Sequence, residues 1–244
     1  MQIMKNFIWL FIFNLTMINM SAQKTITFPS LDGLPVTADL YESKNTDPYL
    51  ILFHQARFSR GEYKETAEKL VKLGYNCLAV DLRSGDEVNY VKNKTAEAAR
   101  EKGLPTEYAD AKQDMQAAIE YAYKLSKKNV VIFGSSYSAS LSLLLAKENS
   151  HVKAVIAFSP GEYFNKENMV RDAIEGLSKP IFAASSASEF SYMKEMFTKV
   201  MPNNLTLFKP AKGKGEHGSK VLWQNNPDSS EYWLSLMLFF SQIK

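Results

Sequence analysis

The chain has 244 residues, 45% of them hydrophobic, which suits one globular α/β domain with a sizeable core. Its 29 basic and 26 acidic residues give a net charge of +3, and no basic cluster alternates with aromatic residues. This balance argues against a nucleic-acid-binding protein. The sequence contains no internal repeat and no low-complexity tract, so we predict a single domain over residues 23–244.

The N-terminal 22 residues have the pattern of a secretory signal peptide. Lys5 is the one charge before an apolar run over residues 7–20, and Ser21-Ala22 then supplies the small residues of a cleavage site. An uncleaved membrane anchor is the alternative, but the run is shorter than the ~20 residues that a spanning helix needs. We therefore expect residues 1–22 to be removed. The mature protein is then secreted or periplasmic and has no stable membrane anchor.

The first half of the mature chain opens with two alternating segments and continues with buried strands and helices. Leu31-Asp32-Gly33 supplies a turn between the first two segments, which predicts a hairpin. Cys77, the only cysteine, lies in an apolar run and is expected to be a buried strand residue rather than a catalytic one. The predicted elements are strands at 24–28, 36–41, 49–53 and 75–82 and helices at 62–73 and 105–126.

The second half alternates strands with helices more regularly. Its predicted strands are 129–133, 152–158, 180–184 and 205–208, and its predicted helices are 137–147, 189–200 and 228–242. An antiparallel start followed by this alternation predicts a mostly parallel sheet with helices on both faces. In such sheets the chemistry gathers in loops at the carboxyl ends of the strands.

The most specific motif is Gly134-Ser135-Ser136-Tyr137-Ser138, where a β-branched strand meets a helical pattern. A sharp strand–turn–helix of the form Gly-x-Ser-x-Gly exposes one serine as a nucleophile, although Ser138 here replaces the second glycine. Gly134 marks the strand end, so Ser136 lies at the tip of the turn. The competing interpretation is a serine that caps the helix.

Two further strand ends supply a candidate base and a candidate acid. His217 lies in a glycine-rich loop after the final strand, where it can reach a serine hydroxyl as a general base. Glu189 follows the 180–184 strand and is the preferred acid to orient the imidazole. Glu162, after the preceding strand, is the alternative acid, and an ordinary acid at a helix N-terminus remains the simpler role for either.

The loop after the 49–53 strand is the candidate oxyanion site. Acyl transfer needs two backbone N–H groups directed at the developing oxyanion. Tyr137, the residue after the nucleophile, supplies one N–H, and Gln55 is expected to supply the other. His54 is expected to be a structural, hydrogen-bonded histidine.

Together these residues make the chain resemble the α/β-hydrolase superfamily, and within it the small dienelactone-hydrolase-like group. The resemblance covers nearly the whole mature chain and rests on five segments: Leu52-Phe53-His54-Gln55, Asp81-Leu82-Arg83-Ser84-Gly85, Gly134-x-Ser136-x-Ser138, Glu189 and His217-Gly218. It implies an eight-stranded sheet, with Ser136, Glu189 and His217 as nucleophile, acid and base. Departures are Ser138 for glycine and glutamate where aspartate is commoner.

The implied activity is two-step acyl transfer on a small ester or lactone. No cofactor is needed for this chemistry, and the sequence shows no metal-ligand spacing. Arg57, Arg60 and Arg83 follow strand ends, so one of them is expected to bind a substrate carboxylate, with Arg57 and Arg83 as the candidates. For Arg83 a structural pair with Asp81 or a loop carbonyl is the favoured alternative.

Two other functions compete with an exported serine hydrolase. One is a non-catalytic binding module on the same fold, against which the intact set of serine, acid and histidine argues. The other is a serine peptidase, which commonly carries an additional recognition domain that this chain does not show.

Overall fold

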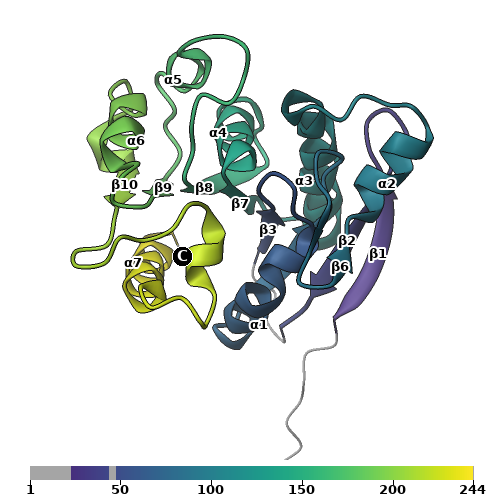
Figure 1. Ribbon diagram of the computed structural model, residues 1–244, viewed down its shortest axis with the longest axis horizontal. Coiled ribbons are helices and arrows are strands. Elements are labelled where there is room, and N and C mark those ends of the chain that lie inside the picture. The colour runs from purple at the N-terminus through teal and green to yellow at the C-terminus, as the bar shows by residue number, and fades with distance from the viewer. Residues whose placement is uncertain (1–22, 44–47, 244) are drawn as a thin grey trace, which may run out of the picture.

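The computed structural model describes residues 23–43 and 48–243, and its centre is an eight-stranded sheet in the order β1-β2-β4-β3-β7-β8-β9-β10 (Figure 1). The predicted signal peptide lies outside the described residues. β2 pairs antiparallel with both β1 and β4, and every other neighbouring pair is parallel. The strands are β1 Lys24–Pro29, β2 Pro35–Tyr41, β3 Tyr49–Phe53, β4 Asn76–Val80, β7 Val130–Ser135, β8 Val152–Phe158, β9 Ile181–Ala184 and β10 Leu205–Phe208. This architecture confirms the predicted fold class.

The central strands are buried on both faces, as their continuous apolar sequences predict. Every residue of β3, β4 and β7 is buried. Alternate side chains enter different layers, so Ile51 packs with one core cluster while Leu50 and Leu52 pack with the other. Cys77 lies on β4 as a fully buried free thiol, which confirms its predicted role in the core.

Helices cover both faces of the sheet. One layer contains α3 Lys112–Ser126, α4 Tyr137–Glu148, α5 Met169–Ala173 and α6 Phe190–Met196. The opposite layer contains α1 Lys64–Lys72 and α7 Ser229–Gln242. Figure 1 shows the sheet running between these two layers.

Two predicted helices begin later than the sequence pattern suggested. Each is preceded by a 3-10 turn, η1 Arg60–Tyr63 before α1 and η2 Tyr108–Ala111 before α3. Two more 3-10 turns, η3 Pro202–Asn204 and η4 Ser219–Leu222, lie in the last quarter of the chain. The amphipathic period does not distinguish such a turn from the first turn of an α-helix.

The polar segment between β4 and α3 contains structure that the sequence analysis missed. A small hairpin of β5 Glu87–Val88 and β6 Val91–Lys92 turns through Asn89 and Tyr90, both with positive φ. The helix α2 Lys94–Glu101 follows, and the Asn93 side chain caps it by accepting from the Ala96 N–H at 2.8 Å. Strands of two residues have no detectable alternation, which is why this hairpin escaped the pattern.

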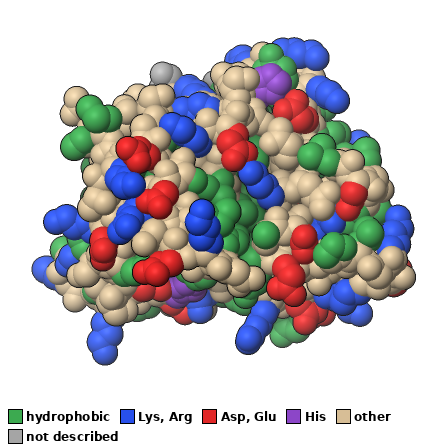
Figure 2. All heavy atoms as spheres, turned by 90° about the horizontal axis from the view of Figure 1, so that it is seen from above, with side chains coloured by type: hydrophobic (Ala, Val, Ile, Leu, Met, Phe, Trp, Pro, Cys, Tyr) green, Lys and Arg blue, Asp and Glu red, His purple; other side chains and the backbone are tan. Residues whose placement is uncertain are grey.

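The surface charges are mixed, in line with the nearly balanced composition. Figure 2 shows apolar side chains gathered near the middle of one face, with acidic and basic side chains interspersed around them. Within residues 23–43 and 48–243, none of the helices has the length and apolar character needed to cross a bilayer.

Candidate active site

The turn between β7 and α4 holds Ser136 in a strained backbone conformation. Its φ of 60° and ψ of −124° lie in a region that non-glycine residues rarely adopt. Strand and helix approach closely here, because a Cβ on Gly134 would lie 2.5 Å from the backbone of Ala139. Ser136 is 5% exposed, so this turn at the end of the sheet encloses most of the residue.

The serine at position 138 is explained by its own hydrogen bonds. Its Oγ lies 2.7 Å from the Phe53 carbonyl at the end of β3 and accepts from the Ser135 N–H at 2.9 Å. The side chain is completely buried. A glycine could not make this link, so the substitution ties the turn to the neighbouring strand without blocking Ser136.

His217 connects Ser136 to an acid. Its Nε2 lies 2.8 Å from Ser136 Oγ, and its Nδ1 bonds to Glu189 Oε1. With Glu189 ionised, the proton lies on Nδ1 and Nε2 can accept from the serine hydroxyl. Gly218 follows at a φ of 78°, and a Cβ there would lie 2.1 Å from Gln55 Oε1. The loop therefore needs glycine beside the histidine.

Glu189 is held as a carboxylate by several donors. Its Oε2 accepts from Ser159 Oγ at 2.8 Å and from Ser186 Oγ at 2.9 Å. Partial burial alone would raise the pKa of Glu189, but the hydrogen bonds from His217, Ser159 and Ser186 outweigh it and lower the pKa to about 2. Glu189 is thus ionised at neutral pH and suited to orient an imidazole.

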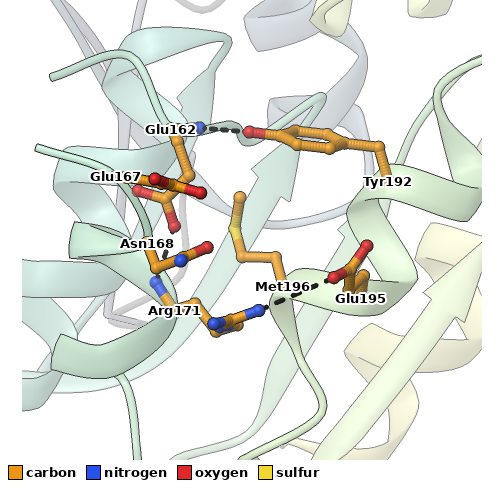
Figure 3. A pocket seen from close by; sticks show the side chains of 7 residues that line it. All are labelled: Glu162, Glu167, Asn168, Arg171, Tyr192, Glu195 and Met196. Atoms are coloured by element: carbon orange, nitrogen blue, oxygen red, sulfur yellow. Dashed lines mark hydrogen bonds and ion pairs between the residues drawn. The ribbon is translucent and has the colours of Figure 1, made fainter.

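The alternative acid, Glu162, is engaged elsewhere. Its carboxylate accepts from the backbone N–H groups of Val170 and Arg171 at 2.8 and 2.9 Å, at the start of α5. It also lines a cavity of about 260 Å³ between the β8–α5 loop and α6 (Figure 3). The lining residues are Glu162, Glu167, Asn168, Arg171, Tyr192, Glu195 and Met196. Of the two candidate acids, only Glu189 contacts His217.

The backbone N–H of Gln55 is engaged in a hydrogen bond, which corrects the role expected for Gln55. The Gln55 N–H donates at 2.7 Å to Oε2 of Glu62, a fully buried carboxylate. A buried N–H with such a partner has no capacity left for an oxyanion, so the expectation for Gln55 is wrong in this structure. The Tyr137 N–H, at the first position of α4, has no partner among residues 23–43 and 48–243.

His54 is structural, as expected. Its Nε2 accepts from the Leu82 N–H at 2.9 Å, so its Nδ1–H donates to the Gln55 carbonyl at 2.8 Å. Complete burial lowers the pKa of His54 to about 4, which keeps the ring neutral. The ring therefore fixes the orientation of the peptide that joins Gln55 to Ala56.

The two candidate arginines differ completely. Arg83 is fully buried and pairs with Asp114 at 2.8 Å and Asp32 at 2.9 Å, so it cannot bind a substrate. The structural alternative holds, but with other partners, because Asp81 pairs with Arg60 at 2.7 Å. Arg57 is exposed at a φ of 64° beside Ala56, and no ion pair engages it in the described part of the chain.

The sequence analysis missed two residues near Ser136. Glu62 had been assigned only to the start of an amphipathic helix, and nothing in its local pattern marks it as buried. Tyr163 donates to the Ser159 carbonyl at 2.9 Å and also interacts with the Ser136 hydroxyl. Burial, opposed by that interaction, raises the pKa of Tyr163, so the residue remains a neutral phenol.

Within the described ranges no cluster of three or more His, Cys, Asp or Glu side chains could hold a metal ion.

Solved structures share this fold at low sequence identity. An esterase from Pyrococcus furiosus is 18% identical with a TM-score of 0.70, covering 91% of this chain and 93% of its own. A dienelactone hydrolase from Anabaena variabilis is 12% identical with a TM-score of 0.69, covering 92% and 99% respectively. The esterase domain of a Rhodothermus marinus protein is 14% identical with a TM-score of 0.61, covering 90% and 97%.

A comparison with curated proteins gives no significant match. Residues 36–204, more than half of the chain and the part that carries Ser136 and Glu189, match the dienelactone hydrolase family. This chain belongs to the dienelactone hydrolase family, whose members are ester and lactone hydrolases on an α/β-hydrolase fold.

Proposed function

We propose that the protein is an exported serine hydrolase that cleaves small esters or lactones through Ser136, His217 and Glu189. The observation that carries the proposal is the 2.8 Å contact between His217 Nε2 and Ser136 Oγ, with Glu189 on the opposite ring nitrogen. The strained φ of Ser136 supports the same conclusion, because strain of this kind is typical of a nucleophile turn.

The reaction proceeds in two acyl-transfer steps. His217 Nε2 takes the proton of Ser136 as Oγ attacks the carbonyl carbon, and the carboxylate of Glu189 stabilises the imidazolium. The imidazolium then donates its proton to the leaving oxygen as the ester bond breaks. In the second step His217 removes a proton from water as its oxygen attacks the acyl carbon, and the imidazolium then returns a proton to Ser136 Oγ as the acyl–Oγ bond breaks and the acid is released.

The oxyanion is bound by the N–H groups of Tyr137 and Ala56. Ala56 replaces Gln55 in this role because the Gln55 N–H is already bonded to Glu62. The Gln55 carbonyl accepts from His54 Nδ1 at 2.8 Å and from the Phe58 N–H at 3.3 Å. In a trans peptide the next N–H points away from that carbonyl. The Ala56 N–H has no other partner among the described residues, which supports its assignment.

A hydrolysis assay tests the proposal and its competitors. The wild type should hydrolyse phenyl acetate and dihydrocoumarin, and a Ser136→Ala variant of equal thermal stability should not. Neither protein should cleave unstructured peptides. Peptide cleavage that Ser136→Ala removes would establish a peptidase instead. Absence of any turnover, with ligand binding retained, would establish a binding module.

Export is a separate part of the proposal. Residues 1–22 are a signal peptide, and cleavage after Ala22 delivers the mature chain to the periplasm or the exterior. Expression of the full sequence in a bacterium with an outer membrane, followed by N-terminal sequencing of the periplasmic fraction, should yield a chain that starts at Gln23. A full-length chain retained in the membrane fraction would contradict it.

A further inference from the structure

Glu62 is a buried acid that the proposed mechanism does not use. It lies in η1 with 1% of its surface exposed, and no lysine or arginine pairs with it in the described part of the chain. Elsewhere in this protein the buried carboxylates of Asp39, Asp81 and Asp114 pair with arginines. A buried carboxylate without a cation is costly unless hydrogen-bond donors surround it. The burial of Glu62 must therefore be compensated by the hydrogen-bond donors around its carboxylate.

Its polar contacts come from three different segments around Ser136. Oε2 accepts from the Gln55 N–H at 2.7 Å, and Oε1 accepts from Ser219 Oγ at 2.6 Å. The Ser135 hydroxyl lies near this carboxylate and helps to lower its pKa. Gln55 begins the proposed oxyanion loop, Ser135 precedes the nucleophile, and Ser219 lies two residues after His217.

Two further hydrogen bonds join the segments around Glu62. Ser135 Oγ accepts from the Ser219 N–H at 2.8 Å, which joins the nucleophile turn directly to the histidine loop. The Glu62 carbonyl accepts from Trp223 Nε1 at 2.8 Å, beyond the end of η4. Without the carboxylate, the Gln55 N–H and the Ser219 hydroxyl would be buried without acceptors, and both segments would shift to find new ones.

We propose that Glu62 is a positioning residue that fixes the oxyanion loop, the nucleophile turn and the histidine loop relative to one another. This inference rests on the proposed hydrolase function, because it concerns the geometry of that site. The bond to Gln55 sets the start of the loop whose next N–H, that of Ala56, receives the oxyanion. The bond to Ser219 sets the position of the loop that carries His217.

Four variants test the kinetic consequence on phenyl acetate, after wild-type turnover and the inactivity of Ser136→Ala have been established. Glu62→Ala should lower kcat about 100-fold, because displacements near 1 Å cost roughly this much, while KM stays within about 3-fold. Glu62→Gln should stay within about 5-fold of the wild type, since its amide oxygen still accepts from Gln55 and its NH₂ can donate to Ser219. Glu65→Ala and Glu65→Gln are the matched controls, because exposed Glu65 lies on α1 one turn further on.

The controls should keep wild-type kcat. The proposal is overturned if Glu62→Ala has the kcat of Glu65→Ala, or if folded Glu62→Gln is as slow as Glu62→Ala. A wild type without Ser136-dependent turnover would instead overturn the proposed hydrolase function, so the two failures are distinguishable.

A second readout needs no activity and covers the case in which Glu62→Ala does not fold. Burial raises the pKa of Glu62 to about 6 against the hydrogen bonds from Ser219 and Gln55 and the nearby Ser135 hydroxyl. The other titratable groups that face it are His217, Tyr63 and Tyr137, and burial raises the pKa of both tyrosines well above 10. The amide proton of Gln55 should therefore shift in NMR spectra with a midpoint near pH 6 in the wild type and in His217→Ala. It should not shift in Glu62→Gln. A Gln55 signal that titrates equally in Glu62→Gln overturns the proposal, because the shift would then not come from the Glu62 carboxyl group.

Discussion

Two regions of the molecule bury carboxylates in opposite ways. Beside the N-terminal hairpin, Arg83 pairs with Asp32 and Asp114, and Arg60 pairs with Asp39 and Asp81. Beside Ser136, by contrast, Glu189 and Glu62 have only imidazole, hydroxyl and backbone N–H groups as partners. Both arrangements give the carboxylate oxygens hydrogen-bond partners, but they differ in whether those partners can exchange a proton.

A guanidinium keeps its proton throughout the pH range of most enzymes, so an arginine stabilises its paired carboxylate but cannot exchange a proton with it. An imidazole accepts and releases a proton within the pH range of most enzymes, and a hydroxyl can reverse its bond. The region around Ser136 therefore contains groups that can transfer a proton or rearrange a hydrogen bond when charge develops during a reaction.

The largest effect is expected for Ser136→Ala. Removal of the attacking oxygen should lower kcat by at least about 10⁴-fold on phenyl acetate, with little change in thermal stability. Steady-state hydrolysis and a thermal melt of the same preparation measure both quantities. A variant with more than a tenth of wild-type kcat would assign the chemistry to another residue.

Glu189→Gln should be the next most damaging to activity. An amide in place of the carboxylate no longer stabilises the imidazolium and can hold the wrong tautomer, so kcat should fall about 10³-fold. Glu162→Gln is the matched control, because it removes the same charge from the residue that accepts from Val170 and Arg171. It should keep wild-type kcat. Equal activity losses in the two variants would show that Glu189 has no special place in the reaction.

Arg83→Met should affect folding alone. The substitution leaves Asp114 as a buried charge without its partner, which should cost about 3–5 kcal/mol of unfolding free energy. Urea denaturation measures this cost, and the folded fraction should hydrolyse ester with wild-type kcat. A large drop in kcat with unchanged stability would return Arg83 to the substrate site.

Glu62 should make a pH-dependent contribution to stability. Its pKa is about 6 in the folded protein and 4.5 as a reference for the unfolded chain, so the folded state binds more protons between these values. The stabilisation should therefore be fully present below the unfolded pKa of 4.5 and be lost as pH rises through 6, by about 2 kcal/mol over the complete transition. Burial also raises the pKa of Asp81 to about 6, but this contribution is the same in the wild type and in Glu62→Gln. Urea denaturation of both proteins across the transition therefore isolates the effect of Glu62. Parallel curves would mean that Glu62 does not titrate there.

The smallest effect is expected for Arg57, the exposed arginine in the loop after β3. We propose that Arg57 binds the carboxylate of anionic substrates. Arg57→Ala should lower kcat/KM about 5-fold for an ester with a free carboxylate and leave a neutral ester unchanged, as expected for one exposed charge pair. Equal losses on both esters would remove Arg57 from substrate recognition.

The sequence predicted the sheet, the turn that carries Ser136 and the loop that carries His217 because each depends on a local pattern. Apolar runs mark the buried strands, and the loops that follow them carry the polar residues. The choice between Glu189 and Glu162 depended on where the His217 loop lies in space, which no local pattern encodes. Gln55 was misassigned for the same reason, since its N–H partner Glu62 lies seven residues away on a turn that read as ordinary helix.

The proposed mechanism depends on a reactive hydroxyl at Ser136. Incubation with a fluorophosphonate, followed by intact-mass measurement and peptide mapping, tests this directly. We expect one adduct per chain, located on Ser136, and none in Ser136→Ala. An unmodified wild type, or an adduct that persists in Ser136→Ala, would contradict the assignment of Ser136 as the nucleophile.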